Sequence, residues 1–172
     1  MKPAPRKAVL TTHISSSVGW FGAVVGFLAL ALTAANSKEI LMVRAAYLSM
    51  AAISRFVIVP LAFAALLSGF VQALATPWGL FRHSWIVVKL AFTIFATAVL
   101  LLKMPLIVHA ARLAMVSAAM SALDQADREL IVHSAGGAFL LFVITIVSVF
   151  KPWGLTQYGR RKLSEKTVHV AE

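Results

Sequence analysis

The chain contains no cysteine and few charged residues, and both absences narrow the class of protein. Without cysteine, disulfides, thiolate metal sites and thiol catalysis are excluded. Charged residues make up only 13% of the chain, whereas soluble domains carry about 25%. Hydrophobic residues make up 60%. This composition is typical of a polytopic membrane protein with one compact domain.

The sequence also lacks the usual signatures of soluble enzymes. It has no glycine-rich phosphate loop, no H-E-x-x-H and no nucleophile elbow. Its six acidic residues all lie outside the long apolar runs, which argues against catalysis by paired carboxylates. The net charge of +10 comes from Lys and Arg at the ends of those runs and in the tail. Membrane topology therefore explains the charge better than nucleic-acid binding does.

Four apolar stretches predict an all-α, four-span transmembrane helix bundle with helix extensions on the outer side. A helix rises about 1.5 Å per residue, so about 20 residues cross a bilayer. The transmembrane domain covers residues 12–150, with spans near 12–35, 56–71, 85–102 and 130–150. The helical patterns over 40–74 and 85–123 are longer than a bilayer needs, and Pro60 is expected to kink the first of them. Residues 1–11 form a basic N-terminal segment, irregular over 1–9, and residues 151–172 form a mobile basic tail.

The distribution of Lys and Arg predicts the orientation of the bundle. With the N-terminus inside, nine of these residues lie at the inner side and six at the outer side, apart from Lys89 within a span. The positive-inside rule then places both termini in the cytoplasm, in a bacterial inner membrane. The polar turn at Asn36–Glu39 and the segment Asp124–Arg128 are expected outside. The tryptophans fall toward the inner ends of spans, as in an aromatic belt.

Lys89 is the charged residue that the third span has to accommodate. A turn signal at Thr76–Gly79 precedes this span, and Lys89 lies about one turn inside it. A lone ammonium costs about 2.5–3.5 kcal/mol at mid-membrane and less near the surface. No span contains an aspartate or glutamate that could pair with it. The side chain therefore either snorkels to lipid phosphate or meets an anionic group of a ligand, such as a haem propionate.

The histidines outside the tail form two groups under this topology. His13 and His83 lie at inner ends of spans, and His109 and His133 lie on the outer side. Two histidines from different helices at one depth can ligate a haem iron, which allows one site on each side. The alternative is that each histidine keeps its polar tip in the wet interface. Trp20 shares a helix face with His13, and Trp85 shares one with Lys89, so both tryptophans are candidate walls of the inner site.

Methionine and glycine give two further patterns. Thioether and imidazole ligands suit monovalent copper, although methionine also fills gaps between apolar helices. The outer side carries five of the methionines: Met42, Met50, Met104, Met115 and Met120. Gly22 and Gly26 form a G-x-x-x-G pair, which either packs within the bundle or joins two copies of the chain.

Two short motifs carry a resemblance to known membrane proteins. The stretch from His13 to Trp20 resembles the H-x6-W of the first helix in bacterial haem-containing protoporphyrinogen oxidases and copper resistance D-type proteins. The stretch from Trp85 to Leu90 resembles the W-x3-K-L of a later helix, and Gly69 with Thr76–Gly79 resembles the D-type lead-in. The resemblance covers residues 10–102 and implies that His13 ligates haem with Lys89 as its companion. Trp20 is followed by Phe21, Gly22 and Ala23, not by the arginine-rich stretch of the oxidases.

These patterns lead to one main functional hypothesis and two alternatives. The first is a small membrane protein that binds b-type haem for electron transfer or redox chemistry, which includes a haem-dependent oxidoreductase. Its cofactor site would contain His13, Lys89, Trp20, Trp85 and His83, with His13 and His83 on the iron. One alternative is a copper-handling or copper-transport protein that uses the outer methionines with His109 and His133. The other is a non-catalytic accessory subunit of a membrane complex. The expected partners are the lipid bilayer and a redox partner, with no nucleic acid.

Overall fold

The described part of the chain is almost entirely helical. A computed structural model describes residues 3–75, 81–116, 123–152 and 154–162. The elements are α1 (Pro3–Asn36), α2 (Ile40–Ile53), the π-helical turn η1 (Ser54–Ile58), α3 (Val59–Ala75), α4 (Ser84–Ala114) and α5 (Leu123–Phe150). Four helical stretches are long and apolar enough to cross a membrane: Ala4–Asn36, Ile40–Leu74, Ser84–Ala114 and Gln125–Phe150. The predicted all-α, four-span bundle is therefore confirmed.

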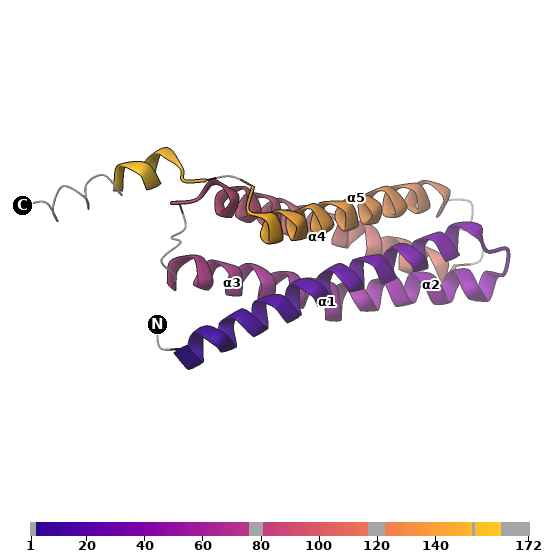
Figure 1. The fold of residues 1–172 in the computed structure, drawn as a ribbon. Helices are drawn as coiled ribbons and strands as arrows, with labels where there is room; N and C mark the ends of the chain where they lie inside the picture. The colour runs from indigo at the N-terminus through magenta and orange to yellow at the C-terminus, as the bar shows by residue number, and fades with distance from the viewer. Residues whose placement is uncertain (1–2, 76–80, 117–122, 153, 163–172) are drawn as a thin grey trace, which may run out of the picture.

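The helices lie side by side along one long axis (Figure 1). Both chain termini lie at one end, called the terminal end here, as four crossings require. The connection from α1 to α2, the end of α4 and the start of α5 lie at the other end, called the loop end. Helix α1 packs against α2, α3 and α5, and α4 packs against α5, α2 and α3.

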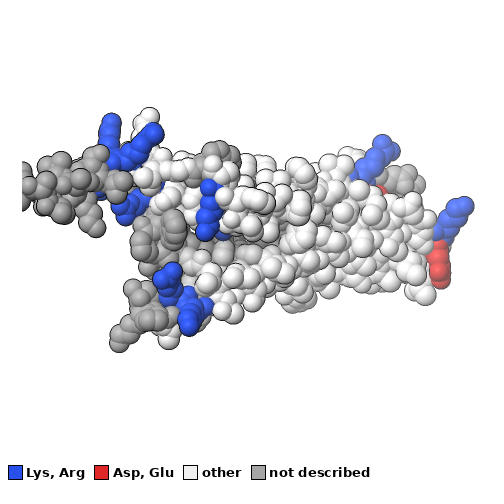
Figure 2. All heavy atoms as spheres, in the orientation of Figure 1, with Lys and Arg blue, Asp and Glu red and all other residues white. Residues whose placement is uncertain are grey.

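Small residues line the helix contacts, and large apolar residues face outward. Ala31, Ala62 and Ala114 are fully buried between helices. Phe56 and Phe139, by contrast, are 71% and 70% exposed. Such a surface would be unfavourable in water, but lipid tails are as apolar as these side chains. Charged side chains gather toward the two ends of the molecule, and the middle is mostly uncharged (Figure 2). The chain is therefore a multi-pass membrane protein in contact with the bilayer.

The second span contains a π-helical turn next to a proline. The amide of Val59 bonds to the carbonyl of Ser54, five residues earlier, instead of the usual four. Pro60 has no amide hydrogen, so the regular ladder is already interrupted at this point. A single π turn re-pairs the neighbouring backbone groups without ending the helix. The distortion predicted near Pro60 thus takes the form of the η1 turn.

The glycine pair of the first span faces two different environments. Gly22 is exposed, and a β-carbon built on it meets no atom within 4 Å. A β-carbon on Gly26 would lie 3.9 Å from Ile53 Cδ1, in ordinary contact with α2. Gly19 makes the close helix approach, because its β-carbon would lie 3.2 Å from Leu61 Cδ1. Gly26 and Gly19 thus pack within the bundle, while Gly22 remains on its surface.

Three expectations about the ends of helices and of the chain were wrong. Residues 3–9 are helical rather than irregular, since Pro3 and Pro5 fall in the first turn, where helix amides have no intrahelical partner. Helix α5 begins at Leu123, earlier than the predicted start of the fourth span near 130, so the helix includes residues 124–128. Residues 154–162 are not a free tail, because they pair with the segment before α4. The turn predicted at 76–79 and the end of the 106–123 extension lie outside the described residues.

Candidate functional site

A cavity of about 270 Å³ lies near the terminal end of the bundle, between α1, α3 and α4. It is called the basic cavity here, because its charged lining residues are all cationic: Arg6, Lys89 and Lys151, with His13 beside them. The rest of the lining is mostly apolar: Leu10, Ala65, Leu66, Gly69, Gln72, Ala73, Trp85, Ile86, Leu90 and Thr93. The spacing of these residues puts one face of each helix on the cavity.

His13 enters the cavity from α1 with one ring nitrogen already engaged. Its Nδ1 lies 3.0 Å from the carbonyl oxygen of Ala65 and 3.1 Å from Oγ of Ser68. The Ser68 hydroxyl itself donates to the carbonyl of Ala64. Both neighbours of Nδ1 therefore act as acceptors, which assigns the proton of the neutral ring to Nδ1. The lone pair is then on Nε2, the arrangement found in metal-binding histidines.

Gly69 leaves the space that the His13 ring occupies. A β-carbon built on Gly69 would lie 2.9 Å from Cε1 of His13 and 3.4 Å from its Nδ1. Contacts under 3.0 Å require one of the two groups to move. The ring therefore rests directly against the backbone of α3. This explains why a glycine stands one turn after Ala65, the residue whose carbonyl accepts the imidazole proton.

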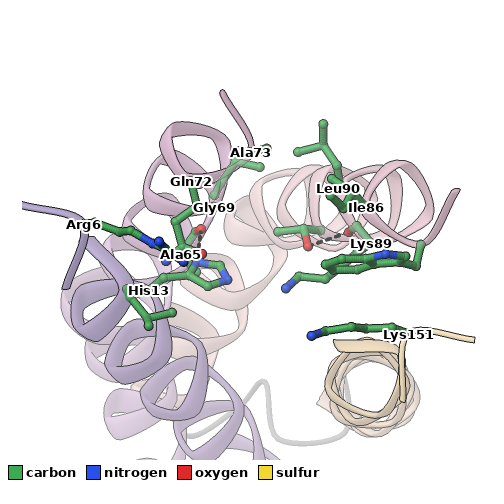
Figure 3. A pocket seen from close by; sticks show the side chains of 14 residues that line it. Arg6, His13, Ala65, Gly69, Gln72, Ala73, Ile86, Lys89, Leu90 and Lys151 are labelled. Atoms are coloured by element: carbon green, nitrogen blue, oxygen red, sulfur yellow. Dashed lines mark hydrogen bonds between the residues drawn. The ribbon is translucent and has the colours of Figure 1, made fainter. Parts of the chain in front are cut away.

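Lys89 faces the same cavity from the opposite wall. Figure 3 shows His13 and Lys89 pointing toward one another from α1 and α4. No carboxylate within the described residues lies near Lys89, and the one ion pair between such residues joins Lys103 and Glu129, 3.1 Å apart, elsewhere in the bundle. The cavity is thus positively charged and has no described counter-charge.

Lys151 reaches the cavity from the segment after α5. Its backbone adopts a positive φ of 46°, a left-handed conformation common where helices end. Its ammonium lies 5.8 Å from the ring centroid of Trp85, within the range of a cation–π interaction. The chain beyond it is anchored, since the amide of Ser84 donates to Gly154 at 3.2 Å and that of Thr156 to Arg82 at 2.9 Å. Backbone pairing at the start of α4 therefore fixes the position of Lys151.

The structure brings together three of the five predicted cofactor residues. His13, Lys89 and Trp85 line the basic cavity, whereas Trp20 and His83 do not. Trp20 shares a helix face with His13, but it lies about 10 Å farther along the axis, at about 1.5 Å per residue, and is buried in a second cavity. His83 caps α4, and its ring lies 6.3 Å from that of Trp85.

The predicted outer site is not assembled around one cavity. His109 lines a shallow hollow with Arg112, and His133 lines the second cavity. His133 Nδ1 lies 2.6 Å from the carbonyl of Glu129, in its own helix. Within the described ranges, no group of three or more His, Cys, Asp or Glu side chains could hold a metal ion. Met50 is fully buried in the core and Met42 is exposed, so these two methionines do not converge.

Sequence reasoning missed Arg6, Gln72 and Lys151 as lining residues. Arg6 precedes His13 by two helical turns, so the spacing could have revealed it if the helix had been expected to begin earlier. Gln72 faces the cavity one turn after Ser68, and its Nε2 donates to the carbonyl of Val9 at 3.2 Å. No sequence pattern indicates that Lys151 lines the cavity. The position of its side chain depends on a positive φ and on backbone pairing with a distant segment.

Comparison of the chain with protein-family models, curated proteins and solved structures finds no match. The resemblance to haem-containing oxidases and copper resistance D-type proteins therefore stays a prediction. Functional assignment has to come from the basic cavity itself.

Proposed function

We propose that this membrane protein binds b-type haem in the basic cavity for electron transfer or redox chemistry. The observation that carries the proposal is the meeting of one imidazole and one ammonium from facing helices, in a cavity with no described carboxylate. A haem presents an iron that accepts an imidazole nitrogen and propionates that accept cations. The lining supplies a chemical partner for each of these groups.

Each lining residue has a definite part in this proposal. His13 would ligate the iron through Nε2, while its Nδ1 proton remains with the Ala65 carbonyl and holds the ring in place. Lys89 and Lys151 would pair with the propionates, and Trp85 would form an apolar wall. Bound haem would supply the one-electron chemistry.

The volume of the cavity restricts how a ligand can sit. About 270 Å³ lies slightly below the ~300–1,000 Å³ typical of ligand pockets. A ligand with an anionic end and an apolar body suits such a cavity, since the body can lie against lipid while the anion meets the lysines. This requirement fits haem, and it also supports a second candidate, an anionic lipid headgroup bound by the same cations.

Titration of haem into detergent-purified protein tests the proposal. We expect wild-type protein to develop a Soret band and to retain haem through gel filtration. His13→Ala should lower the retained haem strongly, whereas His109→Ala should match wild type, because His109 lines a different hollow. Equal retention by both variants would exclude His13 as the ligand. If no haem binds and native mass spectrometry detects a phospholipid that Lys89→Met releases, the lipid candidate is favoured.

A further inference from the structure

A second, larger cavity lies deeper in the bundle and differs from the first in charge. It has a volume of about 510 Å³ and lies between α1, η1, α4 and α5. It is called the apolar cavity here, because most of its lining side chains are hydrophobic, including Trp20, Phe27 and Leu141. Its volume is within the ~300–1,000 Å³ of small-molecule sites.

The apolar cavity has a net neutral lining. Lys103 is the one charged side chain among its described lining residues, and it pairs with Glu129 at 3.1 Å. His133 also lines the cavity, and its Nδ1 lies against the carbonyl of Glu129. An anionic ligand therefore finds no unpaired cation here, in contrast to the basic cavity. The lining favours a neutral molecule.

One polar atom on the cavity wall has no partner. Ser54 is 0% exposed, and its hydroxyl is the one buried side-chain N or O in the described chain without a hydrogen bond. Other helical hydroxyls bond to the carbonyl four residues earlier, as Thr97 does to Thr93 and Ser134 to Leu130. A buried hydroxyl without a partner destabilises the fold, and a ligand that accepts its hydrogen bond removes this penalty. Ser54 is the first residue of η1, and π turns often occur at functional sites.

The cavity is accessible from the lipid side of the bundle. Phe95 and Phe139 line it, and these two side chains are 60% and 70% exposed. Gly136 also lines the cavity and is exposed, and a β-carbon on it would meet no atom within 4 Å. A molecule dissolved in the bilayer can therefore enter the cavity without crossing water.

We propose that the apolar cavity binds a neutral, lipid-soluble molecule with a carbonyl group that accepts a hydrogen bond from the Ser54 hydroxyl. The donor is buried, the walls are apolar and the lining carries no unpaired charge. The site is distinct from the basic cavity and does not depend on haem. Menadione is a suitable probe, because it is neutral, compact and apolar and carries two ring carbonyls.

Quenching of tryptophan fluorescence by menadione in detergent-purified protein tests the site, since Trp20 lines the cavity. We expect saturable quenching in wild type and about fivefold weaker binding in Ser54→Ala, as for the loss of one hydrogen bond. Ser54→Ala should fold normally, because it removes an unpaired hydroxyl. The control ligand 2-methylnaphthalene has no carbonyl and should bind wild type and Ser54→Ala equally.

Three further variants locate the binding. Gly136→Leu should fill the cavity and abolish saturable quenching, whereas Gly136→Ala should leave it unchanged. Lys89→Met should also leave menadione binding unchanged, which separates this site from the basic cavity. The proposal is overturned if quenching is not saturable, or if Ser54→Ala binds menadione as tightly as wild type does. It is likewise overturned if menadione binds a folded Gly136→Leu protein normally.

Discussion

Replacing Gly69 by alanine tests whether the position of the His13 ring determines haem binding. The new methyl group would lie 2.9 Å from His13 Cε1, so the ring must move by about 0.5 Å to restore van der Waals contact. This movement strains the hydrogen bonds from Nδ1 to Ala65 and Ser68, which are 3.0 and 3.1 Å long. Loss of such support for a ligating histidine typically lowers metal affinity about 10–100-fold.

The same substitution should change stability very little. A lost hydrogen bond costs about 0.5–1.5 kcal/mol, and alanine in place of glycine within a helix contributes about 1 kcal/mol in the opposite direction. We therefore expect Gly69→Ala to melt near the wild-type temperature while its haem affinity falls at least tenfold. Haem titration followed by Soret absorbance, together with thermal unfolding, measures both quantities.

Gly22→Ala is the matched control for this prediction. Gly22 is also in a helix, but a β-carbon there meets no atom within 4 Å and points away from the cavity. This variant should keep full haem affinity. If Gly69→Ala binds haem as Gly22→Ala does, the position of the His13 ring does not determine affinity and the reasoning fails.

Three further predictions address charge, topology and packing. Lys89→Met should weaken haem retention without unfolding the bundle. Lys103→Met removes a solvent-screened ion pair outside the basic cavity and should not alter haem retention, as absorption spectroscopy of both variants will show. A cysteine at Ser37 should react with a membrane-impermeant reagent in intact cells and one at Ser164 should not; the reverse pattern contradicts the predicted orientation. Tyr47→Phe should lower the free energy of unfolding by about 1–3 kcal/mol in denaturant titrations, because the buried phenol donates to Asp127; an unchanged value refutes this contribution.

The long apolar runs made the number and order of spans predictable. The second helical pattern was placed at 40–74, and the structure has continuous helix from Ile40 to Ala75. The helical extensions of the second and third spans pack against each other, since Arg44 Nε donates to the carbonyl of Ala114 at 3.0 Å. Hydrophobicity determines these features locally, so one sequence is enough to find them.

The candidate site was only partly predictable. His13 and Lys89 were recognisable because each is polar within an apolar span. Helical periodicity indicates that Trp20 shares a face with His13. It does not indicate which helices pack against that face at each depth, so it could not place Trp20 outside the basic cavity. The position of Lys151 at the cavity depends on backbone pairing between the segments around Ser84 and Gly154. Such long-range contacts leave no periodic pattern in the sequence.

The haem content of the wild-type protein tests the central claim most directly. The protein should be expressed with an ample haem supply, purified in detergent, and measured by absorption spectroscopy and haem assay. The account predicts a Soret band and about one haem per chain, because the basic cavity offers one imidazole from His13. A folded protein with no Soret band under these conditions would contradict it.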